Sequence, residues 1–204
     1  MVRLSADVRR EQFIAGAIEV IAEHGVDGAT TRRIADAVGA SLATLHYCFR
    51  SKEELLWAIW EEEANELWST PSVRGRDGTA GLAAAAAAQL ETGMRWWMDH
   101  ESRAITNIEL GIWARRQNRE LGVRAYDLYL EASAKYLRRH LGPNDDPALV
   151  EPLARLISAA IDGLLLQWFT FQDRDVVLRD VSVLGRSIEA LVNEGLSLSS
   201  ASAE

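Results

Sequence analysis

Apolar residues recur at intervals of three and four along almost the whole chain, and this spacing limits the fold more than any other feature. Near the start, Phe13, Ile14, Ala17 and Ile18 follow it, while Glu11 and other charged residues fall on the remaining faces. This period is typical of amphipathic α-helices. No useful length of sequence alternates apolar and polar residues, as a strand does, and β-hairpin dipeptides are missing. The sequence therefore predicts an all-α protein.

Residues that cap or break helices divide the chain into about nine helices. Ser and Thr cap helix starts because their side-chain oxygens accept hydrogen bonds from free N–H groups, whereas Gly readily ends a helix. The first helix is expected to stop at Gly25, and the next three to begin at Thr30, Ser41 and Ser51, the last with a Ser51–Glu54 capping box and an end near Trp68. Later helices are expected at 81–99, 102–117, 119–141, 153–172 and 176–196, with a break at 69–80 and a loop at 142–147.

Composition narrows the class of protein. Hydrophobic residues make up 48% of the 204, enough for a packed core. The longest apolar runs are far shorter than the roughly 18 residues that span a membrane, and no signal-peptide pattern opens the chain. A single cysteine cannot form an internal disulfide and suits a reducing compartment. We therefore expect a cytoplasmic protein with no membrane partner.

Charge is distributed unevenly along the chain. The net charge is −8, yet the first 52 residues carry seven basic and six acidic side chains, so the remainder carries −9. The N-terminal quarter could therefore face a polyanion while the rest faces away from it.

A helix-turn-helix is predicted at residues 30–49. Gly39–Ala40–Ser41 allows a tight turn, because Gly39 can adopt a left-handed conformation and Ser41 can cap the next helix. Leu45 and Phe49 would anchor that short helix on its inner side. Its outer side chains would then be free to enter a DNA major groove. A corner of an ordinary helical bundle is the competing interpretation.

The run ATTRRIADAVGASLATLHYCFRSKEELL resembles the N-terminal domain of the TetR family of bacterial transcription regulators. The resemblance covers residues 7–67, and a weaker one lies in IDGLLLQW at 161–168. The matching residues are Thr30, Ile34, Ala35, Gly39, Ser41, Thr44, Leu45, Tyr47, Phe49, Ser51, Lys52 and Leu55. The chain departs from the family pattern at Leu42, His46 and Cys48, where members often have Lys, Tyr and His.

The resemblance implies a ligand-responsive transcription regulator, a repressor that a small molecule releases from a palindromic operator. It implies a three-helix DNA-binding domain at 7–67 and a larger helical effector-binding and dimerisation domain at 81–196. The tail at 197–204 is expected to be flexible. The predicted partners are double-stranded operator DNA, a small-molecule effector and a second copy of the chain. The residues predicted to contact DNA are Thr30, Arg32, Arg33, Ser41, Leu42, Ala43, Thr44, His46, Tyr47 and Lys52.

Aromatic side chains and one carboxylate are the candidates for the effector site. Glu109 lies in an otherwise apolar helical stripe with Trp113, and Trp beside Glu suits an aromatic or cationic ligand. Two other interpretations stay open: tryptophans that form ordinary core, and a Glu109 paired with Arg103 or Arg116. The candidate ligand-binding residues are Trp96, Trp97, Glu109, Trp113 and Trp168.

Two apolar stripes near the C-terminus are candidates for a dimer interface, because two helices from each subunit can form a four-helix contact. A core within the monomer is the alternative. The predicted interface residues are Ile161, Leu164, Leu165, Trp168, Val183, Leu184, Ile188 and Leu191.

An enzyme and an architectural DNA-binding protein without an effector are the alternative classes of protein. The sequence has no Gly-rich phosphate loop, no His pair at i and i+4 and no nucleophile–base arrangement, so we expect no enzyme, metal or cofactor. Cys48 invites a redox role, but no second cysteine is present to resolve an oxidised thiol.

Overall fold

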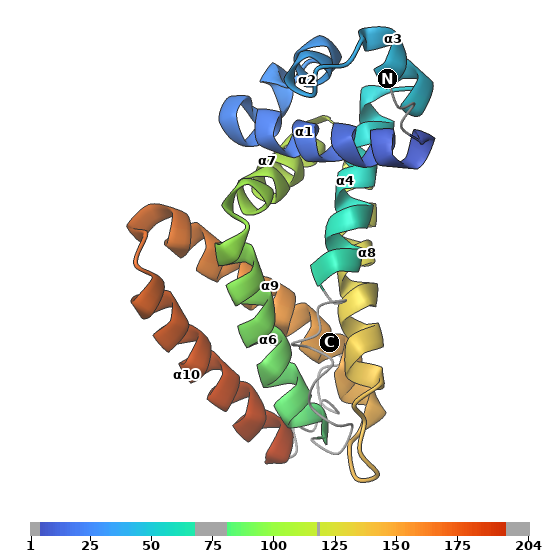
Figure 1. Cartoon of the computed structure of the whole chain (residues 1–204). Coiled ribbons are helices and arrows are strands. Elements are labelled where there is room, and N and C mark those ends of the chain that lie inside the picture. Colours follow the sequence, from blue (N-terminus) through green and yellow to red (C-terminus); the bar gives the residue numbers. More distant parts are fainter. Residues whose placement is uncertain (1–4, 68–80, 118, 195–204) are drawn as a thin grey trace. The chain divides into compact units, whose positions relative to one another are not determined.

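The computed structural model describes residues 5–67, 81–117 and 119–194 (Figure 1). These residues contain nine α-helices, one 3₁₀ helix and no strand, which confirms the all-α prediction. The break expected at 69–80 and the tail expected at 197–204 both lie outside the described residues. The helices are α1 (Ala6–Gly28), α2 (Thr31–Ala37), α3 (Leu42–Cys48), α4 (Lys52–Leu67), α6 (Gly81–Asp99), α7 (Glu101–Gln117), α8 (Arg119–Arg138), η1 (Pro147–Leu149), α9 (Val150–Phe171) and α10 (Arg174–Asn193).

The predicted helix caps form as hydrogen bonds. The Thr30 side chain accepts from the Arg33 N–H at 3.2 Å, and Ser41 Oγ accepts from the Thr44 N–H at 3.1 Å. Ser51 Oγ likewise accepts from the Glu54 N–H at 3.1 Å. The return bond of this capping box differs from expectation, because the Glu54 carboxylate accepts from the backbone N–H of Arg50.

Three helix boundaries differ clearly from those expected. Gly25 does interrupt α1, with φ +69° and ψ 169°, but one further turn follows and the Ala29 N–H donates to the Gly25 carbonyl. The helix therefore kinks at Gly25 instead of ending there. The final long helices also begin earlier than expected, α9 at Val150 after the 3₁₀ turn and α10 after the Asp173 cap.

The chain divides into two compact units. The first holds the described residues up to Asn65 together with residues 100–128, and the second holds residues 66–99 and those from 129 onward. Helix α7 therefore belongs to the first unit, although it falls within the range 81–196 expected for the effector domain.

The first unit is built around α1, which packs on α2, α3 and α7. Phe13 and Ile18 on α1 and Ile34 on α2 are almost completely buried. The crossing of α1 and α2 depends on Gly16, since a Cβ there would lie 2.3 Å from Cγ1 of Val38. This close approach holds the helix-turn-helix against α1.

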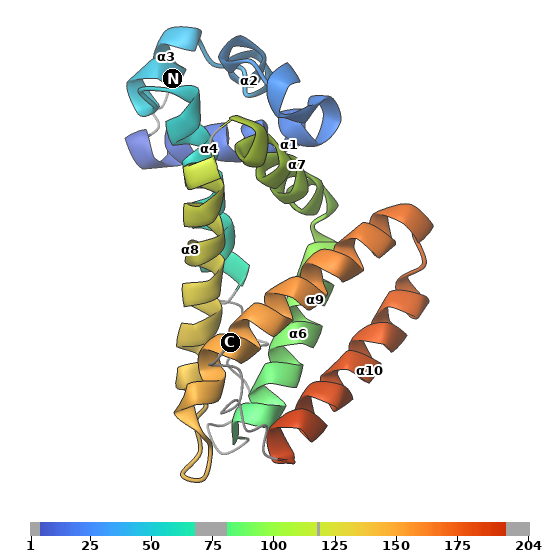
Figure 2. The same ribbon diagram turned by 180° about the vertical axis from the view of Figure 1, so that it is seen from behind.

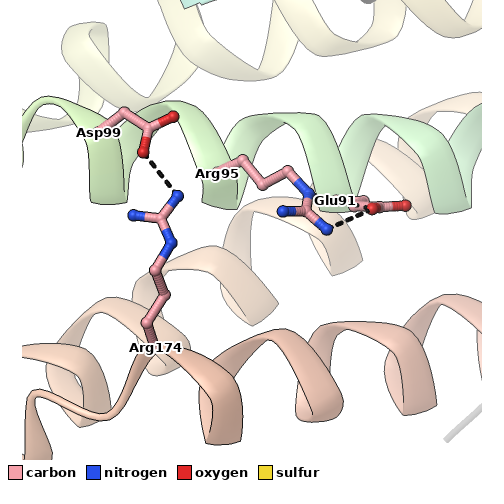
Figure 3. Close-up of polar contacts among 4 residues, drawn as sticks. All are labelled: Glu91, Arg95, Asp99 and Arg174. Atoms are coloured by element: carbon pink, nitrogen blue, oxygen red, sulfur yellow. Dashed lines mark hydrogen bonds and ion pairs between the residues drawn. The ribbon is translucent and has the colours of Figure 1, made fainter.

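The second unit is built around α6, which packs on both α9 and α10 (Figure 2). At one end of α6, Asp145 of the 142–147 loop accepts from the Leu82 N–H at 2.7 Å. At the other end, Arg174 donates to Asp99 at 2.6 Å and joins α10 to α6 (Figure 3). The Arg95–Glu91 pair lies along α6 itself.

Candidate DNA-binding interface

The turn between α2 and α3 has the geometry that the sequence predicts. Gly39 has φ +63°, a left-handed conformation that residues with a Cβ rarely adopt. The Ala40 N–H donates to the Ala35 carbonyl at 2.9 Å, which closes the end of α2. Ala35 itself is 1% exposed, so its small side chain is buried beside this turn.

Two buried side chains hold the seven-residue helix α3 in place. Leu45 and Phe49 are both completely buried, as expected. The Phe49 ring lies edge-on to Phe13 of α1, with 6.5 Å between ring centroids. Helices this short are unstable alone, so α3 depends on these tertiary contacts.

The opposite face of α3 is exposed to solvent. Tyr47 is 83% exposed and Leu42 39% exposed, while Ala43 and His46 are also exposed. Within the described residues, the side chains of His46 and Tyr47 form no hydrogen bond or ion pair. These four side chains are therefore available to base edges, and none of them is needed to hold the fold.

Thr44 lies between the two faces. It is half-buried, and its hydroxyl shares a hydrogen bond of 2.8 Å with the hydroxyl of Ser41. Since both hydroxyls lie at the N-terminus of α3, they and the free N–H groups there could together meet a phosphate.

The three cations predicted to contact DNA differ in their surroundings. Arg32 is exposed and has no hydrogen bond or ion pair within the described residues. Arg33 donates to the Gly28 carbonyl at 2.6 Å, and Lys52 Nζ donates to the Val26 carbonyl. Two of the three cations are therefore already bound to the last turn of α1. Arg33 and Lys52 join that turn to α2 and α4.

The half-buried position of Lys52 also affects its protonation. Desolvation lowers the pKa of its ammonium group, and the nearby carboxylates of Asp27 and Glu53 act in the opposite direction. The bond to Val26 thus satisfies an ammonium group that is partly removed from water.

Arg10 is a residue of this region that the sequence analysis missed. Its guanidinium donates to the Cys48 carbonyl at 3.2 Å and lies 4.2 Å from the Phe49 ring centroid. It also lies 3.8 Å from Glu54. Only its position at helical spacing on α1 was visible in the sequence, and that position gives no sign of contacts 38 or more residues away.

The candidate effector residues fall in both compact units. Trp96, Trp97 and Trp168 are buried in the second unit, and the adjacent rings of Trp96 and Trp97 lie 4.8 Å apart. The indole N–H of Trp168 has no acceptor among the described residues. Glu109 and Trp113 are half-buried on α7 in the first unit.

Glu109 lies against the kink of α1. A Cβ on Gly25 would be 3.3 Å from the Glu109 carboxylate. The expected alternative, an ion pair of Glu109 with Arg103 or Arg116, is not formed among the described residues, and Arg103 pairs with Glu62 at 2.8 Å. Within the described part of the chain, Glu109 has no hydrogen bond or ion pair.

The residues expected at the dimer interface separate into two groups. Five of them are at most 9% exposed within the single chain. Four of these five lie on α9, which packs on α6 and α10 in the second unit. The burial of all five agrees with the alternative of a core within the monomer, and their place at a dimer interface stays a prediction: Ile161, Leu164, Leu165, Trp168 and Ile188. Val183 and Leu191 are exposed, and Leu184 is half-buried, so these three remain available to a partner.

The described residues contain neither a cluster of metal-binding side chains nor a helix that could span a membrane. No three His, Cys, Asp or Glu side chains among them could together hold a metal ion. None of the described helices is long and apolar enough to cross a membrane.

Known proteins resemble this chain in sequence and in fold. The family of bacterial regulatory proteins named tetR matches residues 13–59. The nicotine-responsive transcriptional repressor HdnoR of Paenarthrobacter nicotinovorans is 32% identical over 170 residues, or 82% of this chain and 87% of that protein. The transcriptional repressor AcnR of Corynebacterium diphtheriae is 25% identical over 190 residues, or 90% and 93%.

A solved structure is similar over nearly the same length. The regulator FadR of Bacillus subtilis, in complex with stearoyl-CoA, aligns with a TM-score of 0.65 at 20% identity and covers 89% of this chain and 96% of its own. At this identity the likeness concerns the fold alone.

Proposed function

We propose that this chain, which belongs to the TetR family of bacterial regulatory proteins, represses transcription as a homodimer bound to operator DNA. A small organic molecule would bind the protein and release it from that DNA. The chain is a DNA-binding transcription regulator, as its relatives are. The single observation that carries the proposed DNA interface is α3, whose outer side chains are exposed and unengaged while Leu45 and Phe49 are buried. This activity belongs in the cytoplasm, where a bacterium keeps its DNA.

The DNA contacts are proposed to have two kinds of partner. Leu42, Ala43, His46 and Tyr47 would meet base edges and set the sequence preference. Phosphates would be met by Arg32, by the hydroxyls at the starts of α2 and α3, and by Arg33 and Lys52. Since these last two cations already bind carbonyl oxygens, we assign the leading phosphate contact to Arg32.

The test is selection of operator DNA from random sequence, followed by affinity measurements at several salt concentrations. Arg32→Ala is expected to weaken binding to all sequences alike and to lower the salt slope by about one, as loss of one phosphate contact does. Arg115→Ala on α7 is the matched control, because Arg115 is also exposed and carries the same charge.

Two results would refute this interface. One is the absence of any enriched sequence with the wild-type protein. The other is an Arg32→Ala variant that binds selected DNA with the same affinity and salt slope as Arg115→Ala.

Dimerisation is proposed through exposed apolar positions of α9 and α10. On α9, Leu156, Ala159, Gly163 and Leu166 are exposed at spacings of three and four, which places them on one face. A Cβ at Gly163 would meet nothing within 4 Å, so a partner helix can approach closely there. Val183 and Leu191 provide the apolar surface of α10.

The effector is proposed to be an organic cation or a nitrogen heterocycle. Support comes from the nicotine-responsive relative and, within the first unit, from Glu109 and Trp113. Glu109 and Trp113 are four residues apart on α7, so they share a face that offers a carboxylate beside an aromatic ring.

Glu109→Gln is expected to weaken the response to a cationic effector about tenfold while leaving operator affinity unchanged. The substitution keeps the shape but removes the charge, and a hydrogen bond to a charged group contributes about 1.5 kcal/mol or more. Nicotine is the first probe, titrated against preformed protein–operator complex with DNA release as the signal. Glu61→Gln on the exposed face of α4 is the control. Equal nicotine responses from the two variants would remove Glu109 from the effector site.

A further inference from the structure

Arg10 contacts the end of one helix and the beginning of the next. Cys48 is the last residue of α3, Phe49 is its C-cap, and Glu54 lies in the first turn of α4. The guanidinium donates to the Cys48 carbonyl at 3.2 Å, lies over the Phe49 ring and approaches Glu54 to 3.8 Å. One side chain of α1 therefore contacts both sides of the connection between α3 and α4.

Each of these contacts has a physical reason to persist. The last carbonyls of a helix have no partner within the helix and carry a partial negative charge, so a cation there is favourable. The flat guanidinium can stack on an aromatic ring while its edges donate hydrogen bonds, which a lysine ammonium does less well. Glu54 in turn accepts from the Arg50 N–H at 2.8 Å, which ties the connection itself into the same set of contacts.

We infer that Arg10 is a positioning residue that sets the orientation of α3 for base reading, instead of contacting DNA phosphate itself. The inference rests on the proposed DNA interface. A helix of seven residues has few contacts to define its direction, and Leu45 and Phe49 both act on its inner side. Arg10 adds the one described polar contact from α1 to the end of α3, through the Cys48 carbonyl.

The chain offers a matched control in the neighbouring residue. Arg9 carries the same charge on the same helix, but its described polar contact is a hydrogen bond to Gln12 within α1. Arg9→Met and Arg10→Met thus remove equal charge from adjacent positions, and only the second removes contacts to α3 and α4.

The experiment measures affinity for operator selected by the wild-type protein and for scrambled DNA, across a salt series and well below each variant's melting temperature. Arg10→Met is expected to lower the ratio of operator to scrambled affinity about tenfold, which corresponds to the loss of one base contact, with an unchanged salt slope. Arg10→Lys is measured as a second variant in case Arg10→Met folds poorly, because it keeps the positive charge. The ratio of operator to scrambled affinity is expected to fall in this variant too. Arg9→Met is expected to keep the wild-type ratio.

Three outcomes would overturn the inference. Equal weakening on both DNAs with a salt slope lower by about one would make Arg10 a phosphate contact. A lower melting temperature with unchanged discrimination in Arg10→Met, or in Arg10→Lys if the first is unfolded, would make it merely structural. A wild-type protein that enriches no sequence would refute the DNA interface itself, and the inference about Arg10 would fall with it.

Discussion

Replacing Phe49 with alanine is expected to lower the free energy of unfolding by about 3–5 kcal/mol and to abolish operator binding. Phe49 is completely buried, packs edge-on against Phe13 and lies under the Arg10 guanidinium. Truncating a buried phenylalanine leaves a cavity and removes its transfer free energy, which together cost this much. Since small domains are stable by only about 5–15 kcal/mol, α3 would lose its orientation even where the rest stays folded.

Urea denaturation followed by circular dichroism measures this loss. Leu42→Ala is the control, because Leu42 lies on the same helix but is 39% exposed and is expected to change stability by about 0.5 kcal/mol or less. A Phe49→Ala variant that lost less than about 1 kcal/mol would show that α3 is held mainly by other contacts.

Val183→Glu is expected to convert the proposed dimer to monomers and to lower operator affinity by about 10²–10⁴-fold. In a twofold interface each substitution appears twice, so two carboxylates would enter the same apolar contact. Two linked DNA-binding domains bind an operator about 10²–10⁴-fold more tightly than one domain alone, and separate monomers lose this gain. Two recognition helices reach half-sites about 34 Å apart only when the subunits stay together.

The matched control for this variant is Val123→Glu. Val183 and Val123 are 51% and 49% exposed, so the two substitutions place the same charge on equally open surface, and Val123 lies on α8 in the first unit. Sedimentation equilibrium measures the mass of each variant. A dimeric Val183→Glu protein, or a Val123→Glu protein that dissociates instead, would mean that α10 does not form the interface.

Features set by near neighbours in the sequence were predictable. Thr30 and Ser41 each cap a helix by reaching three residues forward, and the Gly39 turn needs only its own conformational freedom. The burial of Leu45 and Phe49 was predictable because these apolar residues are four apart and so lie on one side of the helix.

Features that depend on residues far apart in the sequence could not be predicted. The bond from Lys52 to Val26 spans 26 residues, and that from Arg10 to Cys48 spans 38. The sequence predicted Lys52 as a DNA contact, but it could not reveal the Val26 carbonyl that only folding brings near. Periodicity likewise showed that Ile161 and Leu164 share an apolar stripe, yet it could not decide whether the chain or a second copy covers them.

On α3, the residues proposed to recognise the DNA sequence are different from those that hold the fold. Leu42, Ala43, His46 and Tyr47 point into solvent, while Leu45 and Phe49 beneath them hold the helix. Changes at the four outer positions should therefore alter which DNA is read with little cost in stability, because exposed substitutions usually cost about 0.5 kcal/mol or less. A library randomised at those four codons would yield mostly folded regulators with new operators, so this scaffold can be recoded without redesigning its core.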